Sequence, residues 1–158
     1  MTIETTRFGN VEYQPERVIT IGKGLPGLEA LHRFVIVDAE ATKPIVWLQS
    51  LEDVDIALPV IYAFEIVEDY AFDVQDDDIE ALEIRNAEDL IVLNVVVLPE
   101  DVTGMTANML APILINTRLG QGCQVFIESS EYATKTPIFD RICAYMQKGG
   151  DVLAGTDA

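Results

Sequence analysis

This sequence of 158 residues has little of what most catalytic and metal sites are built from. It contains one histidine, two cysteines, and ten lysines and arginines against 27 aspartates and glutamates. The single histidine, His32, excludes a zinc site with several histidine ligands and gives histidine-centred catalysis little to work with. Cys123 and Cys143 fit buried thiols of a cytosolic protein, although on count alone one disulfide stays open.

Long hydrophobic runs are also missing. No apolar run approaches the roughly 20 residues that a membrane-spanning helix needs. The first ten residues have neither the basic region nor the apolar core of a signal peptide. We therefore expect a cytoplasmic protein that does not enter a membrane.

Basic residues are too few to hold phosphate groups. The formal net charge of −17 argues against direct binding to nucleic acids or to anionic membranes, which both require lysine and arginine. Two interpretations of the acidity remain. It either serves solubility, or it attracts a basic protein partner, because opposite charge accelerates encounter.

Catalytic and cofactor motifs are incomplete. The sequence lacks the G-x-S-x-G motif that seats a serine nucleophile. Residues Gly22–Gly27 spell G-x-G-x-x-G, but Pro26 removes an N–H where a phosphate would need one, and no βαβ unit surrounds the motif, so we expect a structural turn. The run Asp76–Asp78 lacks the spacing of a calcium loop. Paired carboxylates for glycoside chemistry stay open but have no location. We predict a protein without enzymatic activity, metal or cofactor.

What the chain does contain is apolar sequence in short segments. Apolar residues make up 49% of it. Short runs rich in valine, isoleucine and leucine recur about every ten residues. This spacing predicts a mainly β fold, an antiparallel barrel or sandwich-like single domain over residues 1–150, and a frayed tail over 151–158.

Four segments illustrate the expected elements. Leu90–Leu98 is the longest apolar run and is predicted to be a central strand. Tyr70–Gln75 alternates apolar and polar residues and predicts a half-buried strand. Ile56–Phe64 is apolar but contains Pro59, which places it at a sheet edge or a bulge. Pro137–Lys148 has helical periodicity, with Thr136 as its expected N-cap, and predicts one C-terminal helix.

The stretch Thr103–Ile127 is expected to form two paired strands, Leu110–Ile115 and Gln124–Ile127, joined by the turn-rich Asn116–Gly122. Three amide side chains interrupt this apolar block. A buried amide without hydrogen-bond partners costs about 1–3 kcal/mol. These amides therefore either hold the loops in shape or face a partner. They are Asn108, Asn116 and Gln124.

Acidic residues are concentrated in residues 65–101. This segment holds 13 of the 27 acidic residues and a single basic one, Arg85. Because it is expected to contain strands and turns, its carboxylates either ring one side of the body or disperse over the surface. The first arrangement would steer a basic protein.

The order and spacing of several motifs resemble those of the FliW family of bacterial flagellar assembly factors, over about Phe8 to Ile138. The markers are Gly24-Leu25-Pro26-Gly27-Leu28-Glu29 followed by Phe34, Pro44 with Leu48-Gln49-Ser50-Leu51, Glu88-Asp89, Thr106 with Asn108, Leu110-Ala111-Pro112-Ile113, Ile115-Asn116, Gly122 and Gln124-Val125. The chain departs from the family pattern at Pro59–Phe64 and at Lys135-Thr136.

The resemblance implies a small, mostly β, non-enzymatic cytosolic regulator. FliW proteins bind flagellin and CsrA, a small basic dimer that represses translation, including that of flagellin mRNA. Flagellin export frees FliW to capture CsrA and relieve the repression. The resemblance thus implies that the level of flagellin is coupled to flagellar assembly.

Contact residues are predicted from the amides and the acidic turn. They are Gln49, Ser50, Asp76, Asp77, Asp78, Asn108 and Asn116. A different class of function remains as the alternative, a β-barrel that binds a small apolar ligand. It requires an internal apolar pocket of roughly 300 Å3 or more.

Overall fold

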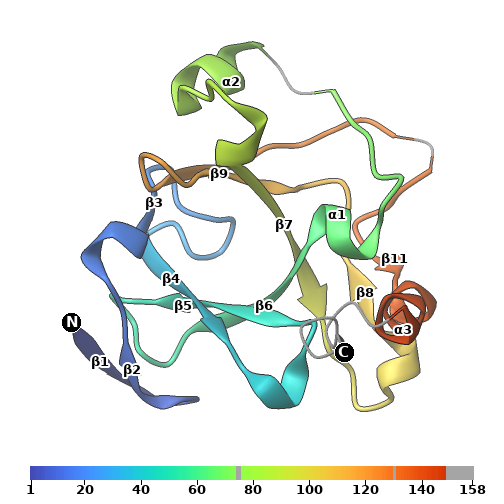
Figure 1. Ribbon diagram of the computed structural model, residues 1–158, viewed down its shortest axis with the longest axis horizontal. Coiled ribbons are helices and arrows are strands. Elements are labelled where there is room, and N and C mark those ends of the chain that lie inside the picture. The colour runs from blue at the N-terminus through green and yellow to red at the C-terminus, as the bar shows by residue number, and fades with distance from the viewer. Residues whose placement is uncertain (74–75, 130, 149–158) are drawn as a thin grey trace.

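Seven strands close into a β-barrel within the part of the chain that the computed structural model describes, residues 1–73, 76–129 and 131–148, with residues 76, 78 and 79 described by their backbone only (Figure 1). The order around the barrel is β7, β6, β5, β4, β3, β10 and β9, and β9 pairs again with β7. The predicted mainly β fold with one C-terminal helix is confirmed. The barrel strands are β3 (Ile19–Ile21), β4 (Arg33–Asp38), β5 (Val46–Ser50), β6 (Ala57–Tyr62), β7 (Leu90–Val97), β9 (Ile113–Asn116) and β10 (Gln121–Gln124).

The remaining elements lie around the barrel (Figure 1). The hairpin of β1 and β2 packs on its outside, where the Phe8 ring meets the Trp47 ring of β5 at 5.8 Å. Two short strands, β8 and β11, extend the sheet beyond β7. The bounds of these elements are β1 (Thr2–Thr5), β2 (Gly9–Glu12), α1 (Ala63–Ile66), α2 (Asp76–Leu82), β8 (Thr106–Ala107), β11 (Thr136–Pro137) and α3 (Phe139–Gln147).

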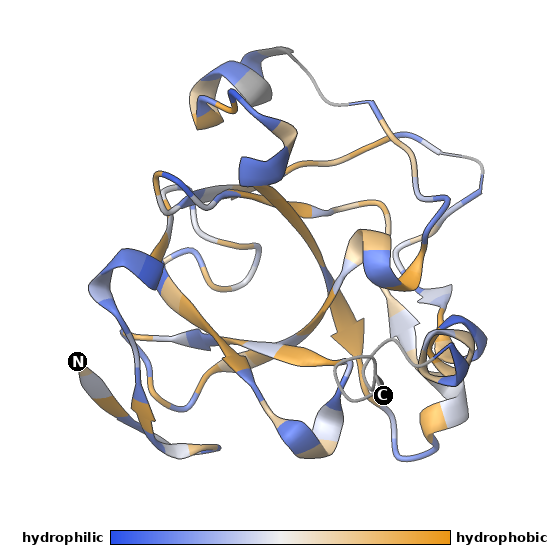
Figure 2. Ribbon diagram, viewed as in Figure 1, coloured by the Kyte–Doolittle hydropathy of each residue, from blue (hydrophilic) through white to orange (hydrophobic). Residues whose placement is uncertain are grey.

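Strand β7 is the central strand that its sequence predicts. It pairs with β6, β8 and β9, and Figure 2 shows it as hydrophobic over most of its length. Ile91 and Leu93 pack with the residues inside the barrel, whereas Val92 and Val96 pack in a second cluster outside it. Because successive side chains of a strand point to opposite faces, a strand buried on both sides is apolar over most of its length. The exception in β7 is the buried Asn94, which donates from Nδ2 to the carbonyl of Asn108.

The barrel closes through a parallel pairing of β3 with β10, in which Thr20 lies opposite Gln121. Gly120 precedes β10 with a φ of +67° and donates its N–H to the carbonyl of Asn116 at 2.8 Å. A Cβ atom there would lie 2.6 Å from the carbonyl oxygen of Val18. Glycine is therefore required where the two strands meet.

The barrel interior is filled by side chains. Phe34, Leu48 and Leu93 are completely buried in it. At the end where β5 stops, Leu25 of the Gly-rich loop is buried against the same cluster, and we call this the closed end. At the opposite end β4 stops at Asp38 and β6 at Tyr62. We call it the open end, because a cavity lies there.

A second apolar cluster covers the outside of β6, β7 and β9 and receives the helices. Ile66 of α1, Leu82 of α2 and Ile142 of α3 are buried in it. Helix α3 is amphipathic and also carries the exposed Met146. All three helices are thereby anchored to one side of the barrel.

The prediction of a strand at Tyr70–Gln75 is wrong for the residues that are described. Residues 71–73 are irregular, and residues 74 and 75 lie outside the described part. Tyr70 donates its hydroxyl to the carbonyl of Met109 at 2.6 Å, and its ring contacts the rings of Phe72 and Tyr132. The alternating pattern thus reflects aromatic anchoring of a loop.

The predicted start of the C-terminal helix is also wrong. Thr136 and Pro137 form β11, which pairs with β8, and α3 begins at Phe139. Ile138 precedes the helix, is buried, and donates its N–H to the carbonyl of Met105 at 3.2 Å. Tertiary pairing therefore overrides the local signals of a threonine cap and a proline at the first helical position.

Pro59 lies in an interior strand and not at an edge. Strand β6 pairs with β5 from Ala57 to Val60, but with β7 only from Val60 to Tyr62. Pro59 thus lies just before the β7 ladder begins. Its missing N–H is tolerated because one side of the strand has no ladder partner at that position.

Candidate functional site

The acidic helix α2 is held to the barrel by the turn between β9 and β10. Asn116, the last residue of β9, donates its Nδ2 hydrogens to the carbonyls of Leu82 at 2.7 Å and Glu83 at 3.2 Å. Arg118 donates from Nη2 to the Glu83 carbonyl at 3.0 Å. Helix ends leave carbonyls without partners inside the helix, and these side chains satisfy them.

Asn116 also shapes the turn that carries it. Its Oδ1 accepts hydrogen bonds from the N–H groups of Arg118 at 2.9 Å and Leu119 at 3.3 Å. The side chain is completely buried. Every polar atom of this amide is therefore occupied within the protein, and a partner could reach only the segments that it holds.

Helix α2 carries the predicted acidic contact residues in its first turn. Asp77 is exposed, as is Glu80, while the side chains of Asp76 and Asp78 lie outside the described part. The helix sequence DDDIEAL contains no basic residue. Figure 1 shows α2 projecting from one side of the barrel, so its described carboxylates face solvent.

A second group of carboxylates, at α1 and the residues after it, is paired with α3. Arg141 Nη1 lies 3.0 Å from Asp69 Oδ1, and Lys148 Nζ lies 3.0 Å from Glu68 Oε1. The hydrogen bond from Arg141 is the main reason why the pKa of Asp69 is lowered. The carboxylates at α1 and α2 therefore form two groups, the α2 group and the paired α1 group, which lie apart in Figure 1. The acidic segment also contains Glu88, Asp89, Glu100 and Asp101, which belong to neither group.

Gln49 and Ser50 lie at the closed end and are completely buried. Gln49 donates from Nε2 to the carbonyls of Ser50, Val54 and Ile56 at 2.9–3.3 Å. Ser50 Oγ accepts hydrogen bonds from the N–H groups of Glu52 and Asp53. The two side chains fix the path of the loop between β5 and β6.

Asn108 is half-buried beside β7. Its Oδ1 accepts a hydrogen bond from the N–H of Leu110 at 3.2 Å, and its carbonyl accepts one from Asn94 Nδ2 at 3.1 Å. The structure therefore does not bring the predicted contact residues together. Gln49 and Ser50 lie at the closed end, whereas Asn116 ends β9 at the open end.

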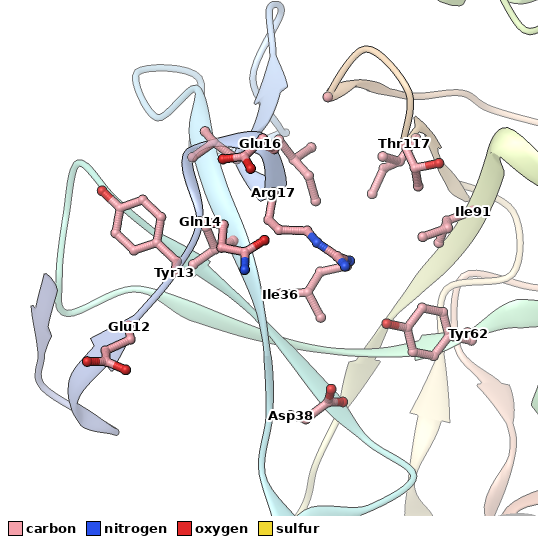
Figure 3. Close-up of a pocket in the computed structure, with 15 residues that line it drawn as sticks. Glu12, Tyr13, Gln14, Glu16, Arg17, Ile36, Asp38, Tyr62, Ile91 and Thr117 are labelled. Atoms are coloured by element: carbon pink, nitrogen blue, oxygen red, sulfur yellow. The ribbon is translucent and has the colours of Figure 1, made fainter. Parts of the chain in front are cut away.

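The structure adds a feature that the sequence did not indicate, a cavity of about 680 Å3 at the open end. Figure 3 shows Arg17 extended into it, above Ile36 and toward Tyr62 and Ile91. Its wall comes from the segment after β2 and from β3, β4, β6, β7 and β9. Because these segments are far apart in the chain, no local motif marks the cavity.

Charge dominates the rim of this cavity. Glu12, Glu16 and Asp38 line it together with Arg17, the one basic residue of the lining. Loss of solvent, followed by the negative charges of Asp38 and Glu65, raises the pKa of Tyr62, and Arg17 offsets this in part. Among the charged side chains that act on the pKa of Tyr62, Asp38 of the rim has the largest effect.

The described residues contain no metal cluster, disulfide or membrane-spanning helix. Among them, no group of three or more histidine, cysteine, aspartate or glutamate side chains is placed to hold a metal ion. Cys123 and Cys143 form no disulfide. No helix in the described part is long and apolar enough to cross a membrane.

Comparison with known proteins agrees with this fold. The FliW protein family matches residues 2–138 of the chain. The chain belongs to the FliW family. It is 40% identical over 141 residues to the flagellar assembly factor FliW of Caldicellulosiruptor saccharolyticus, covering 89% of this chain and 92% of that protein.

Two further FliW relatives extend the comparison. The flagellar assembly factor FliW of Thermoanaerobacter pseudethanolicus is 38% identical over 143 residues, covering 90% of this chain and 95% of that protein. A crystal structure of the flagellar assembly factor FliW superposes with a TM-score of 0.80 at 27% identity, covering 88% of this chain and 97% of that one. The family supports a role in flagellar assembly.

Proposed function

We propose that this protein regulates flagellin synthesis by binding two proteins in the cytoplasm, flagellin and the translational repressor CsrA. Capture of CsrA relieves repression of flagellin translation, and flagellin competes for this capture. Membership of the flagellar assembly factors supports the general role. Flagellin and CsrA are the partners that the resemblance to FliW proteins implies.

The observation that carries the CsrA half of the proposal is the exposed acidic helix α2. The chain has a net charge of −17, and Asp77 and Glu80 of α2 face solvent. The α1 group is partly neutralised by α3. A basic dimer would therefore be attracted most strongly toward α2, which raises the rate of encounter.

Steering by α2 is tested by measuring association rates with CsrA between about 50 and 500 mM salt, where screening becomes strong. The rate should fall as salt rises, and Asp77→Asn with Glu80→Gln should flatten the dependence. Glu4→Gln with Glu100→Gln is the matched control, because both glutamates are exposed and lie in β1 and after β7. An association rate that does not change with salt concentration would refute steering by α2.

Exclusive binding needs a separate experiment. CsrA is titrated against a preformed complex of this protein with flagellin, and the complexes are separated by size. Displacement of flagellin is the expected result. A stable complex of all three proteins would contradict the proposed competition while leaving both binding steps intact.

We further propose that the amides contribute to binding by holding loops, with the acidic turn making the first contact. Asn108→Ala and Asn116→Ala are compared in a pull-down with CsrA, after circular dichroism has established that each variant is folded. Loss of the Asn116 bonds to Leu82 and Glu83 should release α2 and slow association. Unchanged binding by both folded variants would mean that the amides serve only the fold.

The packing of the barrel argues against the alternative function, the binding of a small apolar ligand. The interior side chains Phe34, Leu48, Val60 and Ile113 have no exposed surface, and the cavity lies at the open end with a charged rim. The Gly-rich loop closes the opposite end with Leu25. Within the described residues, an apolar ligand of the barrel would therefore have to share the open-end cavity with the charged rim.

A further inference from the structure

The cavity at the open end combines an apolar floor with an acidic rim. Ile36, Ile91 and Ile115 line it from β4, β7 and β9, and Ile36 and Ile91 are only partly buried. Figure 3 shows Ile36 beside the Arg17 guanidinium, and Ile91 across the cavity between Thr117 and Tyr62. A floor of this kind favours an alkyl chain, because covering it removes apolar surface from water.

The charged residues of the rim determine whether the cavity favours a cation or an anion. Three carboxylates, those of Glu12, Glu16 and Asp38, oppose the single guanidinium of Arg17. At Tyr62 the influence of Asp38 exceeds that of Arg17. The rest of the chain adds to this potential, since the whole chain has a net charge of −17. A cation is therefore favoured over an anion at this end of the barrel.

Arg17 leaves room for such a cation. It is exposed, and among the described residues the structure gives its side chain no ion pair. Its guanidinium lies above Ile36 and points toward Tyr62 and Ile91 (Figure 3). An incoming cation would be repelled by Arg17 and attracted by Asp38, so it is expected to take the Asp38 side of the cavity.

We propose that the open end is a socket for a lysine side chain of a basic protein partner. A lysine joins a four-carbon stem, which suits the isoleucine floor, to an ammonium group, which suits the carboxylate rim. Charge complementarity decides for a basic protein over an acidic or neutral one. Only the identity of that protein rests on the proposed function.

Blocked lysine, N-acetyl-lysine N-methylamide, is the probe that tests the socket without any partner protein. It is titrated into the protein while backbone amide signals are followed by NMR. Saturable shifts are expected for residues around Ile36, Tyr62 and Ile115. Blocked norleucine, which keeps the stem but lacks the charge, should give smaller shifts, as should ammonium, which lacks the stem.

Two substitutions at the cavity are expected to change the affinity for blocked lysine in opposite directions. Asp38→Asn should weaken the binding of blocked lysine about two- to fivefold, the range of a solvent-exposed ion pair, and Arg17→Gln should strengthen it by a similar factor. Glu100→Gln, after β7, is the matched control and should leave the affinity unchanged. All three residues are exposed, so the variants are expected to fold.

The outcomes separate this inference from the proposed function. Absence of saturable shifts, or equal binding by Asp38→Asn and wild type, overturns the socket even if CsrA binds normally. If the protein binds blocked lysine saturably but does not bind CsrA, the socket is upheld and only the proposed partner is contradicted. Tight binding of spermidine without binding of blocked lysine would assign the cavity to a free polyamine and overturn the lysine assignment.

Discussion

The two ends of the barrel are built from the same strands, yet they use polar side chains in opposite ways. At the closed end Gln49 and Ser50 are buried and bonded to the backbone, and the carboxylate of Glu52 accepts hydrogen bonds from the N–H groups of His32 and Arg33. At the open end Arg17 and Asp38 are exposed around a cavity. Polar groups of the closed end hold the chain, whereas the charged groups around the cavity remain available to a partner, and at the open end Asn116 alone of the predicted contact residues holds the chain in the same way.

Removing the apolar plug of the closed end should have the largest effect. Leu25 is 4% exposed within the interior cluster, so Leu25→Ala is expected to lower the free energy of unfolding by about 2–5 kcal/mol. Ile36→Ala at the open end removes a partly buried side chain and should cost about 1–2 kcal/mol. Urea denaturation measures both. Equal losses would contradict the difference between the two ends.

Removing a loop-holding hydroxyl should have an intermediate effect. Ser50→Ala leaves the N–H groups of Glu52 and Asp53 without their acceptor, at an expected cost of about 1–2 kcal/mol. Thr117→Ala near the open end removes an exposed bond to the Asp89 carbonyl and should cost less than about 0.5 kcal/mol. A larger loss for Thr117→Ala in thermal unfolding would reverse the comparison.

Acid should weaken the closed end through Glu52. Hydrogen bonds from the backbone at His32, then Arg33, hold the pKa of Glu52 below its usual 4.5. A lowered pKa means that the carboxylate stabilises the fold above that usual value, and that this contribution is lost as pH falls through the folded pKa. Wild type should therefore exceed Glu52→Gln in melting temperature at neutral pH, and the difference should shrink in acid. A difference independent of pH would count against the bonds.

The smallest effect on stability is expected from the charges of the open end. Asp38→Asn and Arg17→Gln replace exposed groups and should each change the free energy of unfolding by less than about 0.5 kcal/mol. Differential scanning calorimetry is the measurement. A substantial loss in either variant would indicate that these charges hold the fold, as polar groups do at the closed end.

The sequence predicts the strands better than it predicts their closure. The continuous apolar run of β7 identifies a strand buried on both faces, and this is confirmed. The parallel pairing of β3 with β10 could not be predicted from local sequence patterns. The residues near Ile21 contain no signal that identifies Gln121 as part of the partner strand. The predictions at Tyr70 and Thr136 were wrong for a related reason, since contacts with distant residues determine the conformation at both positions.

The candidate site shows the same limit. Acidic density over residues 65–101 is visible in the sequence, but the separation of its α2 group from the α3-paired group depends on tertiary contacts. The amides stand out as polar residues in an apolar block. That Asn116 ties Leu82 and Glu83 to the turn after β9 needs the fold. The open-end cavity is assembled from five separate stretches of the chain and has no sequence signature.

The parallel pairing that closes the barrel can form only late during translation. Thr20 leaves the ribosome long before Gln121, its partner across the seam. Until then β3 has β4 on one side and an unsatisfied edge on the other, and such edges invite pairing with other chains. We therefore expect shortened chains that end before β10 to aggregate, so that the barrel can close only once β10 has been translated.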